Sequence, residues 1–86
     1  MSARSVTEIA ELLVAFVNRE IMAPGHAIHR DDRFDDAGVD SMALLKVLLY
    51  IEQEFGFWVP DEDLVDANVA SASALAGYVA GRLHGE

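Results

Sequence analysis

The residues best suited to chemistry are the five from Gly38 to Met42, where an aspartate-rich stretch enters a long apolar one. Ser41 offers a hydroxyl, and Asp40 precedes it. An enzyme site would need a nucleophile, a base and an oxyanion site that converge in one pocket. Adjacent residues at a helix start do not face each other, and the chain has no Gly-rich phosphate loop, helical metal-binding His pair or G-x-S-x-G elbow. We therefore expect no catalytic activity and interpret Ser41 as an attachment point.

Two interpretations of Ser41 stay open from the residues alone. Serine is a favoured helix N-cap, so Ser41 could simply begin the helix. Alternatively, a phosphodiester on its hydroxyl would lie at the positive end of that helix, near unpaired backbone N–H groups. The second interpretation makes the rest of the chain a scaffold that presents one serine.

Metal binding is not expected. His26 and His29 invite a metal site, but no further His and no Cys lies nearby. The aspartates at 31, 32, 35, 36 and 40 do not form a calcium loop, because Phe34 takes the place of the second ligand after Asp32 and no Glu follows at the twelfth position. An acidic calcium-binding bundle is therefore the weakest of the alternatives.

The net charge of -9 is concentrated in two segments. Residues 30–40 hold five Asp against two Arg, and residues 61–66 hold four acids. Such a field repels nucleic acid and anionic membranes and attracts basic partners, although it could also serve only solubility. Apolar runs such as Val47 to Ile51 are far too short to cross a bilayer, and no signal peptide is visible. We expect a soluble cytoplasmic protein whose residues 1–86 form a single domain.

Periodicity predicts two long helices in the first two thirds of the chain. The first begins at a Ser5–Glu8 capping box and ends near Ile21. Its predicted inner face comprises Val6, Ile9, Leu12, Leu13, Phe16 and Val17. The opposite, solvent-facing side is predicted to hold Glu8, Glu11, Asn18 and Arg19. A connection over residues 23–40 follows, anchored by Ile28 and Phe34. The second helix runs from Ser41 to Phe55 and stops at Gly56.

The second helix is apolar on two faces. Its core face is predicted to contain Leu44, Val47, Leu48, Ile51 and Phe55. A second stripe, Met42, Leu45 and Leu49, is bordered by Lys46 and Gln53. Because few other elements are available to cover it, we predict that this stripe is a docking surface.

The last third is predicted to hold a brief helix and a longer one. Phe57 to Val59 form a short bridge in which Trp58 covers the core edge. The run from Pro60 to Leu64 then starts a brief third helix, with Pro60 at or near its first turn. Ser71 or Ser73 caps the last helix, whose predicted inner face is Ala72, Leu75, Val79 and Leu83. The glycines at 77 and 81 weaken that helix.

The sequence as a whole resembles members of the acyl carrier protein family. The resemblance rests on Gly38 to Met42, the helix closing at Ile51 to Gly56, and the run from Val59 to Leu64, and it extends from the first helix to the last. It implies an all-α, antiparallel four-helix bundle with a short third helix. It also implies that a phosphopantetheinyl transferase attaches 4′-phosphopantetheine from coenzyme A to Ser41, beside Asp40. The thiol of this arm would carry acyl or aminoacyl groups between a loading enzyme and a downstream synthase or transferase.

Two features indicate which kind of carrier protein this chain resembles. Carriers of fatty-acid synthesis bear acids soon after the serine, where this chain has Ala43 and Lys46. Met42 and the Leu48-Leu49 pair are more similar to D-alanyl carriers and to carriers of secondary metabolism. We expect a free-standing monomeric carrier in a polyketide, nonribosomal peptide or aminoacyl pathway. Its predicted docking residues are Met42, Leu45, Lys46, Leu49, Asp61 and Glu62. A D-alanyl carrier, a fatty-acid carrier and, outside the family, a small helical interaction module are the alternatives.

Overall fold

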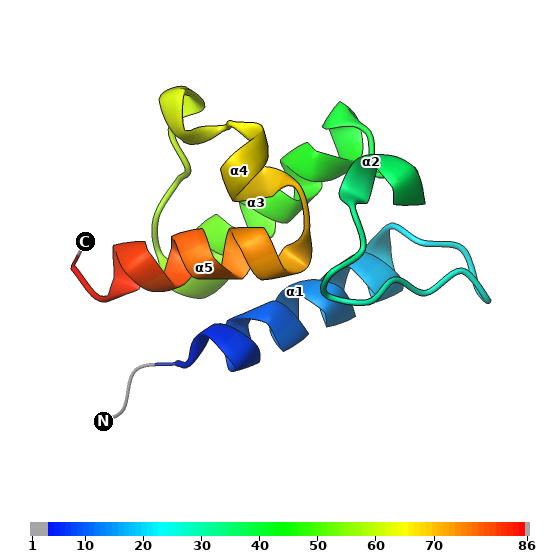
Figure 1. Cartoon of the computed structure of the whole chain (residues 1–86), viewed down its shortest axis with the longest axis horizontal. Coiled ribbons are helices and arrows are strands. Elements are labelled where there is room, and N and C mark those ends of the chain that lie inside the picture. The colour runs from blue at the N-terminus through cyan, green and yellow to red at the C-terminus, as the bar shows by residue number, and fades with distance from the viewer. Residues whose placement is uncertain (1–3, 86) are drawn as a thin grey trace.

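The computed structural model describes residues 4–85, and every regular element in that range is helical. The elements are α1 (Val6–Glu20), α2 (Phe34–Ala37), α3 (Ser41–Phe55), the 3-10 turn η1 (Asp61–Asp63), α4 (Asp66–Val69) and α5 (Ala72–Leu83). Helix α5 runs back along α1 in the opposite direction, and α3 crosses behind α5 (Figure 1). Helix α1 packs mainly against α5 and also contacts α3, while α4 packs against α5. The expected all-α helical bundle is confirmed.

Helix α1 begins as its sequence predicts. The Glu8 N–H donates to Ser5 Oγ (3.1 Å), and the Ser5 N–H donates to Glu8 Oε1 (2.8 Å), which completes the capping box. The inner face of the helix is centred on Ile9, Leu13 and Val17, each fully buried. The core of the bundle joins these side chains to Val47 and Ile51 of α3 and to Leu75, Ala76 and Val79 of α5.

Three residues predicted on inner faces lie partly outside the core: Val6, Leu12 and Leu83. Val6 is 48% exposed and Leu83 is 37% exposed. Helix α1 starts and α5 finishes at the same end of the bundle (Figure 1). Val6 and Leu83 belong to these terminal turns and remain in contact with solvent although their helical spacing is correct, and Leu12 is half-buried.

The connection between α1 and α3 contains more structure than expected. Ile28 and Phe34 are buried, as predicted. Asn18, assigned to the solvent face of α1, is half-buried and makes two hydrogen bonds to Ile28: its Nδ2 donates to the Ile28 carbonyl (3.2 Å), and its Oδ1 accepts from the Ile28 N–H (2.8 Å). The connection also contains α2, a short helix that the sequence pattern does not predict. Both features fix the connection against the bundle.

The brief helix expected to start at Pro60 is divided into two short elements. A single 3-10 turn, η1, follows Pro60, Leu64 and Val65 leave helical geometry, and α4 then begins at Asp66. The break is stable because Asn68 Nδ2 donates to the Asp63 carbonyl (2.9 Å), a group that a continuous helix would have used. In the bridge before η1, Val59 is the buried residue and Trp58 is 43% exposed.

Ser71, not Ser73, caps α5. Its Oγ accepts from the Ala74 N–H (3.1 Å), whereas Ser73 Oγ donates to Asp31 (2.7 Å). Further along α5, the Tyr78 hydroxyl donates to Asp63 (2.6 Å) and accepts from Arg82 (2.9 Å), whose guanidinium lies over the Phe57 ring. These contacts hold the bridge and η1 against α5. None of the helices within residues 4–85 is long and apolar enough to span a membrane.

Candidate functional site at the start of α3

The chain enters α3 along a tightly defined path. Helix α2 ends at Gly38, whose φ of 90° lies in the left-handed region that favours glycine. Val39 is buried, and its N–H donates to the Phe34 carbonyl (2.8 Å). With Phe34 and Val39 both in the core, the next residue must turn outward. The turn therefore places Asp40 and Ser41 at the surface.

Asp40, not Ser41, is the N-cap of α3. Its Oδ1 accepts from the Ala43 N–H (2.9 Å), and its carbonyl accepts from the Leu44 N–H (2.8 Å). Ser41 is the first helical residue and is exposed. The interpretation of Ser41 as a plain cap is therefore wrong, because the neighbouring carboxylate already performs that task.

The Ser41 hydroxyl differs from the other described serines. Ser5 and Ser71 cap helices, and Ser73 bonds to Asp31. Within residues 4–85, Ser41 Oγ makes no hydrogen bond to a protein atom. Its position on the first turn leaves it beside the Ser41 and Met42 N–H groups, which α3 does not use internally. The hydroxyl is thus accessible and unengaged.

A groove of about 260 Å³ opens beside Ser41, between α2, the start of α3 and α4. One part of its lining is apolar and the other is charged. The lining residues are Phe34, Val39, Leu44, Val69 and Ala70, with Arg33, Asp35, Asp40, Ser41 and Asp66. A group attached to Ser41 would have both an apolar wall and a polar rim within reach.

Arg33 joins the two acidic segments at the rim of this groove. Its guanidinium bonds to both carboxylate oxygens of Asp35 (3.1 and 3.2 Å) and to Asp66 of α4 (2.8 Å). The hydrogen bond from Arg33 lowers the pKa of Asp35, and the two carboxylates raise the pKa of Arg33. The sequence pattern indicated two separate acidic segments and no link between them. The two arginines among the aspartates of residues 30–40 were the available signal for such a link.

The predicted docking residues fall into two groups. Met42, Leu45 and Leu49 are 70%, 42% and 44% exposed, and Lys46 is exposed among them. These four lie on the side of α3 opposite Val47 and Ile51. Asp61 and Glu62 are exposed on η1, and within residues 4–85 no hydrogen bond or ion pair links them to Ser41. The α3 residues therefore form one exposed group that begins next to Ser41, whereas Asp61 and Glu62 belong to a different element and do not line the groove beside Ser41.

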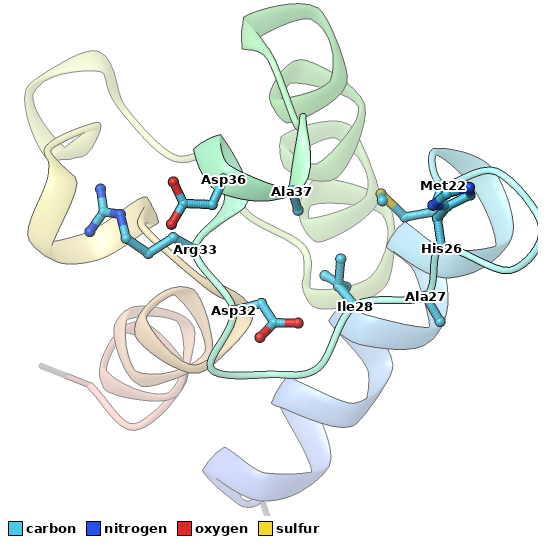
Figure 2. Close-up of a pocket in the computed structure, with 8 residues that line it drawn as sticks. All are labelled: Met22, His26, Ala27, Ile28, Asp32, Arg33, Asp36 and Ala37. Carbon is cyan, nitrogen blue, oxygen red and sulfur yellow. The ribbon is translucent and has the colours of Figure 1, made fainter.

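A larger pocket of about 440 Å³, which Ser41 does not line, lies between the α1–α2 connection and α2 (Figure 2). His26 and Met22 lie on one side of it, across Ile28 and Ala37 from Asp32 and Asp36. His29 approaches Asp32 at 3.5 Å but does not line this pocket. Among the described residues, no group of three or more His, Cys, Asp or Glu side chains could hold a metal ion.

A small helical bundle that presents one unengaged serine at a helix start is the architecture of a carrier protein. Comparison with known proteins agrees: residues 5–79 match the family described as "Phosphopantetheine attachment site". The chain is 29% identical over 76 residues to the acyl carrier protein of Kineococcus radiotolerans, covering 87% of this chain and 91% of that one. It is 30% identical over 74 residues to the acyl carrier protein of Renibacterium salmoninarum, covering 85% and 89%. The chain belongs to the phosphopantetheine-binding acyl carrier protein family.

The chemistry of the residues fits the family's cofactor. Members of this family are non-catalytic carriers with covalently attached 4′-phosphopantetheine, which supplies a thiol for thioester formation. This chain contains no cysteine and so has no thiol of its own. Its exposed Ser41 hydroxyl can bear a phosphodiester. Family membership also removes the support for a small helical interaction module.

Proposed function

We propose that Ser41 bears the 4′-phosphopantetheine arm and that this chain carries acyl or aminoacyl groups on it as thioesters. The observation that carries this proposal is the division of tasks between Asp40 and Ser41. Asp40 caps α3 through its carboxylate, so the adjacent hydroxyl remains free for modification. A serine engaged as the cap would have to give up a backbone hydrogen bond on modification.

The first turn of α3 favours the product of this modification. A phosphodiester on Ser41 Oγ would be close to the two N–H groups that the Asp40 cap leaves unused, and it would lie at the positive end of the helix. The apolar wall of the adjacent groove, formed in part by Val39 and Leu44, gives the arm or its cargo a surface to rest on. The residues of this chain thus position the serine and stabilise its anion.

We further propose that this is a monomeric carrier of a specialised polyketide, nonribosomal peptide or aminoacyl pathway in the cytoplasm. The first turn of α3 has no acidic side chain after the Asp40 cap, and the next helical turn carries Lys46. An enzyme that binds a strongly acidic helix would find few carboxylates along this one. Its partners would be a phosphopantetheinyl transferase, a loading enzyme, and a downstream synthase or transferase.

The exposed residues of α3 are proposed as the surface that these enzymes contact. We call Met42, Leu45, Lys46 and Leu49 the α3 stripe. The three apolar members are exposed, although a helix in a small bundle ordinarily turns such side chains inward. Asp61 and Glu62 on η1 are proposed as a separate acidic contact.

Intact-mass spectrometry tests the attachment site directly. The purified chain is incubated with coenzyme A, magnesium and a phosphopantetheinyl transferase of broad specificity. We expect a mass increase of one phosphopantetheine group in the wild type and none in Ser41→Ala. Ser73→Ala is the matched control and should gain the same mass as the wild type, because its hydroxyl is already bonded to Asp31. An unmodified wild type, or a modified Ser41→Ala, contradicts the proposal.

A further inference from the structure

Lys46 differs from the arginines of this protein because its ammonium has no bonded partner within residues 4–85. It is the chain's only lysine, in a molecule with a net charge of -9. Arg4, Arg19, Arg30 and Arg33 each lie within 4.0 Å of a carboxylate. Arg82 instead bonds to the Tyr78 hydroxyl and covers Phe57. Within residues 4–85, Lys46 has no ion pair.

The local helix cannot supply a partner for this ammonium. On a helix the side chains that reach a residue are those three and four positions away. For Lys46 these are Met42, Ala43, Leu49 and Tyr50, and none carries a charge. The ammonium is consequently surrounded by apolar side chains on its own element.

The α3 stripe starts at the residue after Ser41. With a helical rise of about 1.5 Å per residue, Leu49 lies about 12 Å along the axis from Ser41. Interfaces between proteins ordinarily bury about 800 Å² on each partner. An enzyme whose active site reaches the Ser41 hydroxyl along α3 will therefore cover Lys46 together with its apolar neighbours.

Covering Lys46 without a counter-charge is unfavourable, because an ammonium removed from water needs a paired group. A basic surface would add like-charge repulsion and would leave Met42, Leu45 and Leu49 without apolar contacts. We propose that the transferase which modifies Ser41 presents an apolar socket to Met42, Leu45 and Leu49, with a carboxylate facing Lys46. This inference rests on the proposed function of Ser41. The carboxylate that we propose on the transferase has the opposite sign to the basic surface that the carrier's net negative charge would attract.

The first test is kinetic. The transferase of the organism that makes this chain is assayed with coenzyme A and magnesium, and transfer to Ser41 is followed by intact mass. We expect Lys46→Glu to lower kcat/KM about tenfold, mainly by raising KM, because the charge would oppose the partner's carboxylate. Lys46→Arg keeps the charge and should stay near the wild-type value. Arg19→Glu on α1 changes the net charge equally and is the matched control, with an expected change below about twofold.

The second test locates the contact. A zero-length carbodiimide joins an amine and a carboxylate that touch, with loss of water, as an amide. Since Lys46 is the sole lysine, peptide mapping should identify an amide between its Nζ and an Asp or Glu of the transferase, and Lys46→Arg should lack it.

The outcomes separate the two proposals. A wild type that never gains mass overturns the role of Ser41 and this inference with it. Normal loading with Lys46→Glu at the wild-type rate overturns only the inference. So does cross-linking in which only the chain's carboxylates join lysines of the transferase. A cross-link between two copies of this chain through Lys46 would assign the stripe to self-association instead. Circular dichroism of each variant checks that α3 is intact.

Discussion

At the residue scale, the site depends on two adjacent side chains with different tasks. Asp40 holds the first turn of α3 through the Ala43 N–H, and Ser41 stays exposed. The carboxylate contributes to stability, whereas the hydroxyl contributes nothing visible to the fold. Substitutions at the two positions should therefore separate stability from loading.

Asp40→Ala should destabilise the protein by about 1 kcal/mol, because it removes an N-cap. Asp40→Asn is the matched control. It keeps an acceptor oxygen and should lower the free energy of unfolding by no more than a few tenths of a kcal/mol. Urea denaturation followed by circular dichroism measures both. Equal stability of Asp40→Ala and the wild type would contradict the assignment of the cap.

The sequence pattern suggested Ser41 as the cap of α3, whereas the structure places the cap one residue earlier, at Asp40. Asp and Ser are both favoured caps, and they are adjacent. The choice depends on where the backbone becomes helical, and that point is set by the burial of Phe34 and Val39 on the preceding segment. Tertiary packing of this kind leaves no local signal in the two residues themselves.

At the element scale, the long helices were predictable and the short ones were not. The start of α1 follows from its capping box, and the end of α3 follows from Gly56, whose positive φ ends the helix through backbone conformation alone. Helices α2 and α4 have four residues each, too few to display a helical period. Asn18 was assigned to solvent because a polar residue on a helix ordinarily lies there. Its two bonds to Ile28 require a loop that folds back over α1.

Gly77 is a site where α5 can be strengthened. It is exposed within the helix, and a Cβ added there would meet no atom within 4 Å. Gly77→Ala should stabilise the protein by up to about 1 kcal/mol, because alanine has the higher helix propensity. Thermal unfolding measures the gain.

Gly56→Ala provides the contrast for that prediction. Gly56 also has open space around it, but its φ of 87° is unfavourable for alanine. The same substitution should therefore destabilise the protein at position 56. If alanine stabilised the protein at both positions, or destabilised it at both, backbone conformation would not be what decides the effect of the substitution.

At the scale of the whole molecule, charge connects distant parts of the chain. The two acidic segments are far apart in sequence and meet through Arg33, which bonds to Asp35 and Asp66. Composition alone predicted the sign and size of the field. It did not predict that one arginine would neutralise part of it beside Ser41, since that depends on how α2 and α4 pack.

Two tyrosines should make the protein less stable at alkaline pH. Burial raises the pKa of Tyr78, as does its hydrogen bond to Asp63; burial followed by Glu54 raises the pKa of Tyr50. A group whose pKa is raised on folding stabilises the folded state fully below its unfolded pKa, about 10 for tyrosine. That stabilisation is lost as pH rises through the folded-state pKa.

We therefore expect the Tm to be constant up to about pH 9 and to fall above about pH 10. Tyr78→Phe should lower the Tm at neutral pH, because the bonds to Asp63 and Arg82 are lost, but its decline at high pH should be shallower. Tyr50→Phe should also flatten the decline, and its effect at neutral pH should be smaller because no hydrogen bond of the Tyr50 hydroxyl is found among the described residues. Circular dichroism melts across this pH range give both quantities. A decline as steep in both variants as in the wild type would assign the alkaline instability to the growing net negative charge instead.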